Sequence, residues 1–426
     1  MKLISFCINT SRNELNHIQL LFKSLQQNLS TLEHEIIVFI DSDTENTYEW
    51  LLTQKEIFSD LKILKNILNI PYGYQRNINE LFLNAKHNIV SYLQSDMVIC
   101  KDYDIEVLKQ VRPNMIVCST RIEPPLHGNS GEKITYDFGL DPNVFDLDKF
   151  TEYSESQKQN KITEYFFAPF TLYKDTWNSI GGHDTRFRRS REDSDILIRL
   201  ILNDTKIIQA WNALVYHFTC TSSRGKDWFD PNNKEAQQRT KLQQYADSIE
   251  MSRFFRKWGR FSHDIKKLPV YNISAVITGT LHEQNAYKFK IIEPFFNKIQ
   301  IDQYFIDGIQ PEYINQHQAA NKLLNISADV WNDYSYMYND NEFIKRITTE
   351  NIEDDVVITF DLDQLTDFQV NSFILNLQQI IHQTNELGEF VYDIFNINIQ
   401  NKVDVSKDKI HIQNPEILQK HRYTIH

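Results

Sequence analysis

Cysteine is scarce in this chain, with four residues among 426. The four are Cys7, Cys100, Cys118 and Cys220, and they lie mostly inside apolar runs. They lack the C-x-x-C spacing of metal or redox motifs, and they are too scattered to indicate a disulfide framework. We therefore expect buried free thiols in a reducing compartment.

Long apolar runs are also absent. No window approaches the roughly 18 to 20 apolar residues of a membrane span. The N-terminal stretch MKLISFCINTSRN has one lysine and a short apolar run that polar residues follow at once, which is unlike a signal peptide. These absences predict a soluble cytoplasmic protein without a transmembrane segment, and they leave peripheral contact with a membrane open.

Positive charge is in the minority. Lys and Arg number 45 against 57 Asp and Glu, which gives a formal net charge of −12. Affinity for nucleic acid depends on a basic face that displaces counterions from phosphates. Nucleic acid is therefore not an expected partner.

The length and the order of elements indicate a two-domain α/β protein. Residues 3–9 and 35–41 form apolar runs typical of buried strands, and an amphipathic helical pattern lies between them at 14–29. A helix starting near Arg76 leads to another expected strand at 88–94, whereas 97–160 carries no clear pattern and is expected to be irregular. Strand, helix, strand order predicts a parallel sheet, which binds ligands at the C-terminal ends of its strands.

A helix is predicted in the second half of 177–201, and three carboxylates lie at its start. Glu192, Asp193 and Asp195 are placed where the helix dipole and the unpaired N–H groups favour negative charge. An ionised carboxylate on a rigid element can act as a base. Capping of the helix is the alternative interpretation.

The stretch around these carboxylates resembles family 2 glycosyltransferases, in which a Gly-Gly turn and an aromatic residue precede a Glu-Asp pair. Gly181, Gly182, Phe187, Glu192 and Asp193 carry the resemblance. It implies a GT-A type, Rossmann-like nucleotide-diphospho-sugar transferase domain. It also implies that Asp193 is the catalytic base, with Glu192 beside it.

Further parts of the N-terminal region resemble the donor site of that family. The run EIIVFIDSDTENT is similar to its nucleotide-contacting strand, with Ile40 in place of a first Asp. A following Gly, Arg, Asn pattern is matched by Gly73, Arg76 and Asn77. The donor-binding residues implied in this way are Thr10, Asp41, Asp43, Arg76, Asn77, Ser95 and Arg224. Asp at a strand end is also common in turns.

The resemblance also implies a divalent cation, Mn²⁺ or Mg²⁺, held by Asp96 and His217. Such a cation stabilises the charge of a leaving diphosphate. Gln94 stands where the family often has a further Asp, so a weaker metal site or metal-independent transfer is left open. A histidine between Tyr216 and Phe218 is equally compatible with the core.

The second half of the chain has its own α/β pattern. Residues 273–279, 354–363 and 389–399 are predicted strands, and 367–383 is a predicted helix. We expect a GT-A domain at 1–265 and a smaller α/β domain at 270–426. The smaller domain is open to three interpretations: docking or oligomerisation, a degenerate transferase with Asp361 and Asp363, or a methyltransferase-like unit that lacks a G-x-G loop.

Taken together, the resemblance implies an inverting glycosyltransferase that acts on a nucleotide-diphospho sugar and a hydroxyl acceptor, with a glycan as the expected acceptor. The alternative is a catalytically silent module that binds a nucleotide sugar or a glycan. The replacements at Ile40 and Gln94 favour that alternative. Turnover of a nucleotide sugar distinguishes the two.

Overall fold

The computed structural model describes residues 2–67, 72–126, 130–187, 190–219, 247–259, 269–281, 285–304, 348–384, 386–403, 410, 412 and 423–426. The chain divides into two compact units. Unit 1 comprises the described residues of 1–188, 199–230 and 411–426, and unit 2 those of 189–198 and 231–410. The domain boundary expected between 265 and 270 stays a prediction.

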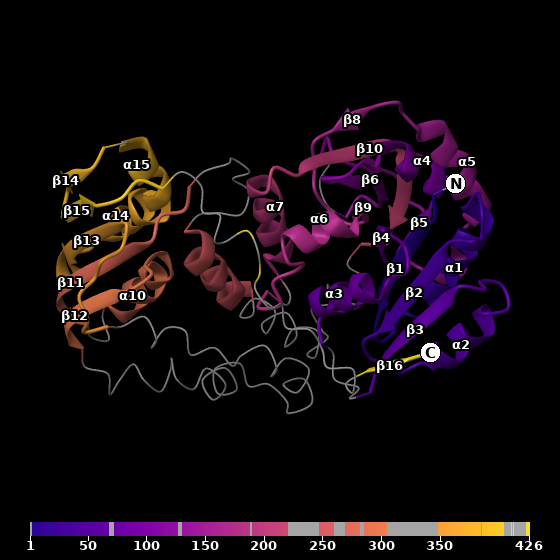
Figure 1. Ribbon diagram of the computed structural model, residues 1–426, viewed down its shortest axis with the longest axis horizontal. Helices are drawn as coiled ribbons and strands as arrows, with labels where there is room; N and C mark the ends of the chain where they lie inside the picture. Colours follow the sequence, from indigo (N-terminus) through magenta and orange to yellow (C-terminus); the bar gives the residue numbers. More distant parts are fainter. Residues whose placement is uncertain are drawn as a thin grey trace. The chain divides into compact units, whose positions relative to one another are not determined.

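A mixed sheet of 11 strands forms the centre of unit 1 (Figure 1). Its order is β16-β3-β2-β1-β4-β9-β6-β10-β5, with β7 beside β6 and β8 beside β10. The strands are β1 (Ile4–Thr10), β2 (Glu35–Ile40), β3 (Leu61–Asn66), β4 (Ile89–Gln94), β5 (Met97–Ile99), β6 (Met115–Glu123), β7 (Ile134–Thr135), β8 (Ile162–Thr163), β9 (Phe170–Tyr173), β10 (Lys206–His217) and β16 (Tyr423–Ile425). The mixed α/β class expected from the sequence is confirmed.

Strands β1, β2 and β4 are buried because their sequences are almost continuously apolar. All six residues of β2 are buried, as are all but one of β1 and of β4. Strands of this composition are typical of a sheet with helices on both faces. The strands expected at 3–9, 35–41 and 88–94 are confirmed to within one residue at each end.

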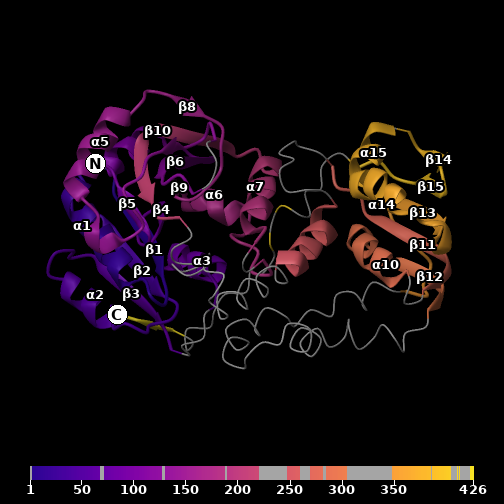
Figure 2. The same ribbon diagram turned by 180° about the vertical axis from the view of Figure 1, so that it is seen from behind.

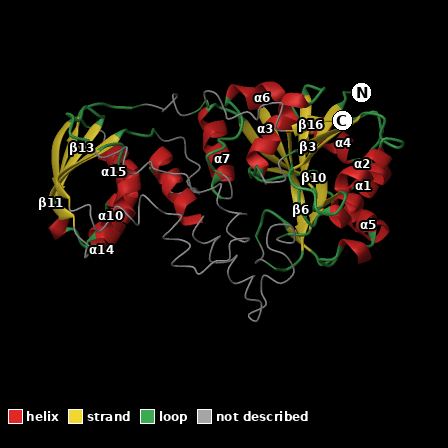
Figure 3. Ribbon diagram, turned by 90° about the horizontal axis from the view of Figure 1, so that it is seen from below, coloured by secondary structure: helices red, strands yellow, loops and turns green. Residues whose placement is uncertain are grey.

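Helices cover both faces of this sheet, with α1, α2, α4 and α5 on one side and α3 and α6 on the other (Figure 3). Helix α1 buries a stripe that includes Ile18, Leu21 and Leu25, as the pattern at 14–29 predicts. The helical segments of this region are α1 (Leu15–Asn28), α2 (Thr47–Gln54), α3 (Tyr74–Asn84), α4 (Tyr103–Gln110), η1 (Pro142–Val144), α5 (Leu147–Gln157), α6 (Lys174–Ser179) and α7 (Glu192–Leu202).

The expectation of irregular structure at 97–160 is wrong. This stretch contains β5, α4, β6 and α5, and β6 lies inside the sheet between β9 and β10. Its sequence, MIVCSTRIE, mixes apolar and polar residues, so it lacks the continuous apolar run of the other inner strands. Pairing with β9 and β10 gives backbone groups of β6 hydrogen-bond partners, so the strand lies inside the sheet in spite of its polar side chains.

The last strand of the chain belongs to the first sheet. Strand β16 pairs antiparallel with β3, with Tyr423 opposite Asn66 and Ile425 opposite Leu64 (Figure 2). Main-chain hydrogen bonds between His426 and Ile63 extend the pairing. The sequence analysis assigned 270–426 to a second domain, and periodicity gave no sign of this return because three residues are too few to show it. An edge strand such as β3 offers unpaired backbone groups to a late segment.

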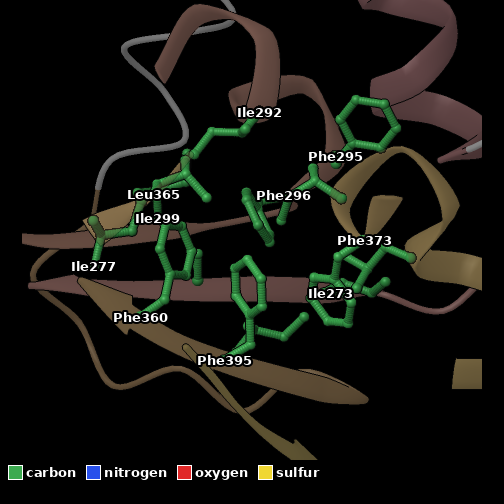
Figure 4. Packing of buried hydrophobic residues seen from close by; sticks show 14 of the residues in the cluster. Ile273, Ile277, Ile292, Phe295, Phe296, Ile299, Phe360, Leu365, Phe373 and Phe395 are labelled. Carbon is green, nitrogen blue, oxygen red and sulfur yellow. The ribbon is translucent and has the colours of Figure 1, made fainter. Parts of the chain in front are cut away.

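Unit 2 has a sheet of five strands in the order β12-β11-β13-β15-β14, with helices on one face (Figure 1). Phe360, Phe373 and Phe395 meet in its core, where the rings of Phe373 and Phe395 stack at 4.2 Å (Figure 4). The elements are β11 (Ile273–Leu281), α10 (Ala286–Ile292), η3 (Glu293–Phe295), β12 (Ile299–Tyr304), β13 (Val356–Asp361), η7 (Leu362–Gln364), α14 (Asp367–Ser372), η8 (Ile374–Asn376), α15 (Leu377–Thr384), β14 (Gly388–Tyr392) and β15 (Phe395–Ile399).

Two predictions for this unit need correction. The stretch 389–399 is a hairpin of β14 and β15 and not one strand, because Asp393 adopts a positive φ of 54° in a two-residue turn between Tyr392 and Phe395. The helix expected at 367–383 is interrupted by η8 between α14 and α15.

Two expectations drawn from absences can be compared with the structure. Cys7, Cys100 and Cys118 are buried free thiols, as expected, whereas Cys220 lies outside the described residues. Within the described ranges, no helix is long and apolar enough to cross a lipid bilayer.

Candidate functional site

Six strands of unit 1 end at one edge of the sheet. Strands β1, β2, β3 and β4 are parallel, and β6 and β10 point the same way because β9 is antiparallel to both β4 and β6. Ligands bind outside this edge in sheets of this kind. The polar residues at or just after the six strand ends are Thr10, Asp41, Asn66, Asp96, Glu123 and His217.

Asp41 follows β2, and its carboxylate is hydrogen-bonded to the residues that lead into α3. Its Oδ1 accepts the backbone N–H of Tyr72 at 2.7 Å, and its Oδ2 accepts that of Gly73 at 3.1 Å. Burial raises the pKa of Asp41, although these hydrogen bonds and those of Asn66 and Asn77 oppose the shift. The carboxylate therefore shapes the loop before α3, and its predicted contact with a donor stays a prediction.

Asp43 supports the start of α2 beside a cavity. Its carboxylate accepts the backbone N–H groups of Thr47 at 2.9 Å and Tyr48 at 3.0 Å. Burial works to raise the pKa of Asp43, but these bonds and the ammonium of Lys65 outweigh it and lower the pKa. The cavity measures about 420 Å³ and is lined by Asp43, Thr44, Asn46, Glu49, Lys65, Asn66 and Ile67.

The start of α3 is held against β1. Asn77 is buried and donates from Nδ2 to Asn9 Oδ1 at 2.8 Å. Thr10 is fully buried, and Arg76 is 8% exposed. The structure thus places all three predicted residues at the strand-end edge, and their contacts with a donor stay predictions.

A carboxyl group that the sequence analysis missed lies beside Ser95. Glu14 Oε2 accepts Ser95 Oγ–H and the backbone N–H of Ser11, both at 2.7 Å. Burial raises the pKa of Glu14 to about 7, and the charge of Asp96 adds to the effect while the bond from Ser95 opposes it. The signal available in the sequence was its position after β1 at a helix start.

Asp96, His217 and Glu123 form a chain of side chains across the ends of β4, β10 and β6. His217 Nδ1 lies 2.8 Å from Glu123 Oε1, and His217 Nε2 lies 3.8 Å from Asp96 Oδ2. Asp96 and His217, which the sequence analysis paired as metal ligands, are therefore neighbours. Their role as ligands stays a prediction.

Glu123, which the sequence analysis also missed, contacts His217 and two basic side chains. Lys133 Nζ lies 2.9 Å from Oε2, and Arg121 Nη1 lies 3.4 Å from Oε1. Burial alone raises the pKa of a carboxyl group, but His217, Arg121 and Lys133 lower that of Glu123 to about 2. A charged residue at the end of a strand was the available signal, and it was overlooked because β6 was not expected.

The donor set partly fits a divalent cation. A carboxylate oxygen of Asp96 and an imidazole nitrogen of His217 are ligands that Mn²⁺ accepts, and Mg²⁺ commonly keeps water and substrate phosphate in its remaining positions. Among the described residues, no three or more His, Cys, Asp or Glu side chains are grouped so that they could hold a metal ion by themselves. A cation here would therefore depend on the phosphates of a bound nucleotide.

The Gly-Gly turn is explained by space and backbone conformation. Gly181 and Gly182 have φ values of +72° and +74°. A Cβ on Gly182 would meet Asn79 Oδ1 at 2.5 Å and Trp177 Nε1 at 2.8 Å. Buried Arg199 donates to the carbonyl of Gly182 at 2.7 Å, which fixes the turn against α7.

The carboxylates at the start of α7 have different surroundings within unit 2. Asp193 is exposed. Glu192 is buried, and burial followed by the charge of Asp193 raises its pKa well above the ordinary range. Asp195 is 1% exposed and accepts Trp258 Nε1–H at 2.9 Å, with Lys257 Nζ 2.5 Å away. Asp195 is therefore structural, whereas Arg224 of the predicted donor set lies outside the described residues.

Comparison with known proteins gives weak likenesses. No family model matches the sequence, and no curated protein matches it. Among solved structures, GalNAc-T7 with UDP, GalNAc and Mn²⁺ is similar at 13% identity and a TM-score of 0.40, over 60% of this chain and 54% of that chain. The mannosyltransferase PcManGT from Pyrobaculum calidifontis in complex with GDP-Man and Mn²⁺ has 14% identity and a TM-score of 0.39, over 59% and 64%.

A third structure, S. aureus TarS 1-349 in complex with UDP, has 13% identity and a TM-score of 0.39, over 96% of this chain and 99% of that chain. The chain spans about half the length of GalNAc-T7. Likenesses at this level carry no argument about the reaction.

Proposed function

We propose that this protein is an inverting glycosyltransferase of GT-A type, which moves a sugar from a nucleotide-diphospho sugar to a hydroxyl acceptor. The observation that carries the proposal is the row formed by Asp96, His217 and Glu123 at the edge where six strands end. A carboxylate oxygen and an imidazole nitrogen at this edge suit a divalent cation, and such a cation would in turn bind the negative oxygens of a diphosphate.

The cavity beside Asp43 and Asn66 is the proposed seat of the nucleoside. It lies at the ends of β2 and β3, and β3 is three strands away from β4 in the sheet. With about 4.8 Å between neighbouring strands, β3 and β4 are about 14 Å apart, a span on the scale of an extended nucleoside diphosphate. Lys65, near Asp43, supplies positive charge along this path.

Asp96 and His217 would hold Mn²⁺ or Mg²⁺ together with the diphosphate. When bound, the cation stabilises the negative charge that develops on the leaving diphosphate. His217 would supply a ring nitrogen and Asp96 a carboxylate oxygen, while Glu123, which lies 2.8 Å from Nδ1, would orient the ring. Because Gln94 replaces a carboxylate, Asp96 is the main charged ligand in this proposal.

Asp193 is the proposed base. It is exposed at a helix N-terminus, where the dipole favours its ionised form. Buried Glu192 is the poorer anion because its pKa is raised. Asp193 takes the proton of the acceptor hydroxyl, the oxygen forms a bond to the anomeric carbon, and the bond to the nucleoside diphosphate breaks on the opposite face, which inverts the centre.

The test is a screen of nucleotide sugars for thermal stabilisation with and without Mn²⁺, followed by assays of sugar transfer. A ligand that binds the folded protein raises the midpoint temperature of unfolding by mass action. A true donor must therefore raise this temperature in a concentration-dependent way. Binding without transfer or hydrolysis supports the silent binding module. Absence of any shift across the nucleotide sugars refutes both the transferase and the nucleotide-sugar-binding module, and a screen of glycans then tests the glycan-binding module.

A further inference from the structure

We infer that Glu123 is a positioning residue that fixes the proton of His217 on Nδ1 and leaves Nε2 as the nitrogen that faces Asp96. The use of Nε2 toward a cation or diphosphate rests on the proposed function. The location of the proton does not, because it follows from contacts within unit 1.

Glu123 and His217 meet at the ends of two neighbouring parallel strands. Glu123 ends β6 and His217 ends β10, 94 residues apart in sequence. The parallel register that places Tyr216 opposite Ile122 brings the two side chains together. At 2.8 Å, Nδ1 and Oε1 make a short hydrogen bond of the kind seen with an ionised partner.

The donor in this hydrogen bond is determined by the other neighbours of Glu123. Lys133 and Arg121 flank the carboxylate of Glu123, and both are permanent donors. Lys133 Nζ donates to Oε2 at 2.9 Å and Arg121 Nη1 donates to Oε1 at 3.4 Å, so both oxygens of Glu123 act as acceptors. Nδ1 must therefore donate, so it carries the proton in the neutral ring as well as in the charged one.

The other ring nitrogen of His217, Nε2, faces Asp96. Nε2 lies 3.8 Å from Asp96 Oδ2, which is beyond hydrogen-bond distance. With the proton fixed on Nδ1, the lone pair of neutral His217 is on Nε2, on the side of Asp96. A second partner that orients a histidine in this way is a common support of metal-ligating imidazoles.

Contacts of the backbone around Glu123 hold its carboxylate in place. The carbonyl of Glu123 accepts the N–H of Tyr136 at 3.0 Å, and β7 pairs with β6 at Ile122 and Glu123. Arg121 is fixed by its Nε, which donates to the carbonyl of Ala168. The carboxylate is thus held from several elements, and its aim at Nδ1 does not depend on a mobile side chain.

The test reads the proton directly, on the full chain without metal. Histidine is labelled with nitrogen-15, long-range proton–nitrogen spectra identify the protonated ring nitrogen at alkaline pH, and His217→Ala assigns the signal. Wild-type His217 should show Nδ1–H. Glu123→Leu should convert it to Nε2–H, the form that isolated imidazole side chains prefer. Glu123→Gln should retain Nδ1–H through its amide oxygen, and exposed Glu152→Gln is the matched control.

The second readout is Mn²⁺ binding in the presence of a nucleoside diphosphate, followed by the electron resonance of the free ion and compared with a protein-free sample. Glu123→Leu should weaken binding by a factor of about 10 to 100, the usual effect of removing an orienting partner, while Glu152→Gln should not change it. A wild-type His217 signal with Nε2–H overturns the inference, and His217→Gln assigns that signal if His217→Ala does not fold. If wild type shows Nδ1–H but binds neither Mn²⁺ nor nucleotide sugar, the proposed function fails and the positioning of the proton stands.

Discussion

The Gly-Gly turn before α7 gives the sharpest quantitative prediction, through Gly182→Ala. The backbone at Gly182 has a φ of +74°, in the left-handed region that disfavours any residue with a Cβ. For a residue with a Cβ, this left-handed backbone conformation costs about 1 to 2 kcal/mol of unfolding free energy. The added Cβ would also lie 2.5 Å from Asn79 Oδ1 and 2.8 Å from Trp177 Nε1.

Neither neighbour can withdraw cheaply. Asn79 is tied to the backbone of His183 by two hydrogen bonds, of 2.9 and 3.0 Å, and Trp177 is 3% exposed and packs its ring 4.8 Å from that of Phe82. Overpacking of this kind costs about 1 to 3 kcal/mol, so the total for Gly182→Ala is about 2 to 5 kcal/mol of unfolding free energy.

Gly139→Ala is the matched control. Gly139 has a φ of +90°, and nothing lies within 4 Å of an added Cβ. Gly139→Ala should therefore lose only the unfolding free energy that the left-handed backbone conformation costs. Denaturant unfolding of wild type and both variants measures the two costs side by side. If Gly182→Ala is no less stable than Gly139→Ala, the crowding argument at the turn is refuted.

Three further outcomes are expected. Asp104→Asn should destabilise the protein at neutral pH by about 1.5 to 3 kcal/mol, because its carboxylate accepts from buried His34 at 3.0 Å. Burial opposes the shift, but His34 and Ser30 lower the pKa of Asp104, so its contribution is present above the unfolded pKa near 3.9 and lost as pH falls through the lower folded pKa. Unfolding of this variant and of exposed Asp175→Asn at neutral and acid pH checks the trend, and a difference that persists in strong acid contradicts it. Asp193→Asn should reduce sugar transfer by about 10² to 10⁴ with unchanged donor affinity, and Glu192→Gln by less; equal rates in wild type and Asp193→Asn would exclude the base role. Asp96→Ala should abolish the part of donor-induced thermal stabilisation that needs Mn²⁺, and an undiminished Mn²⁺ response removes Asp96 from the metal site.

The sequence by itself determined the elements whose signal is local. The apolar runs of β1, β2 and β4 are long enough to show burial on both faces, and the stripe of α1 shows its period. The same reasoning located Asp41 and Asp96 at strand ends, where ligands bind in a parallel sheet. It failed for β6, because polar residues interrupt the apolar run of this strand. Its position between β9 and β10, which makes it an inner strand, depends on segments far away in the sequence.

Only the tertiary structure decided which of these residues meet. His217 and Glu123 come together because β10 pairs in parallel with β6, and no local pattern fixes which strands are neighbours. The same holds for β16, whose three residues join β3 from the far end of the chain. Sheet order is set by long-range hydrogen bonding and by packing against the helices, whereas periodicity reports only the face that a segment buries.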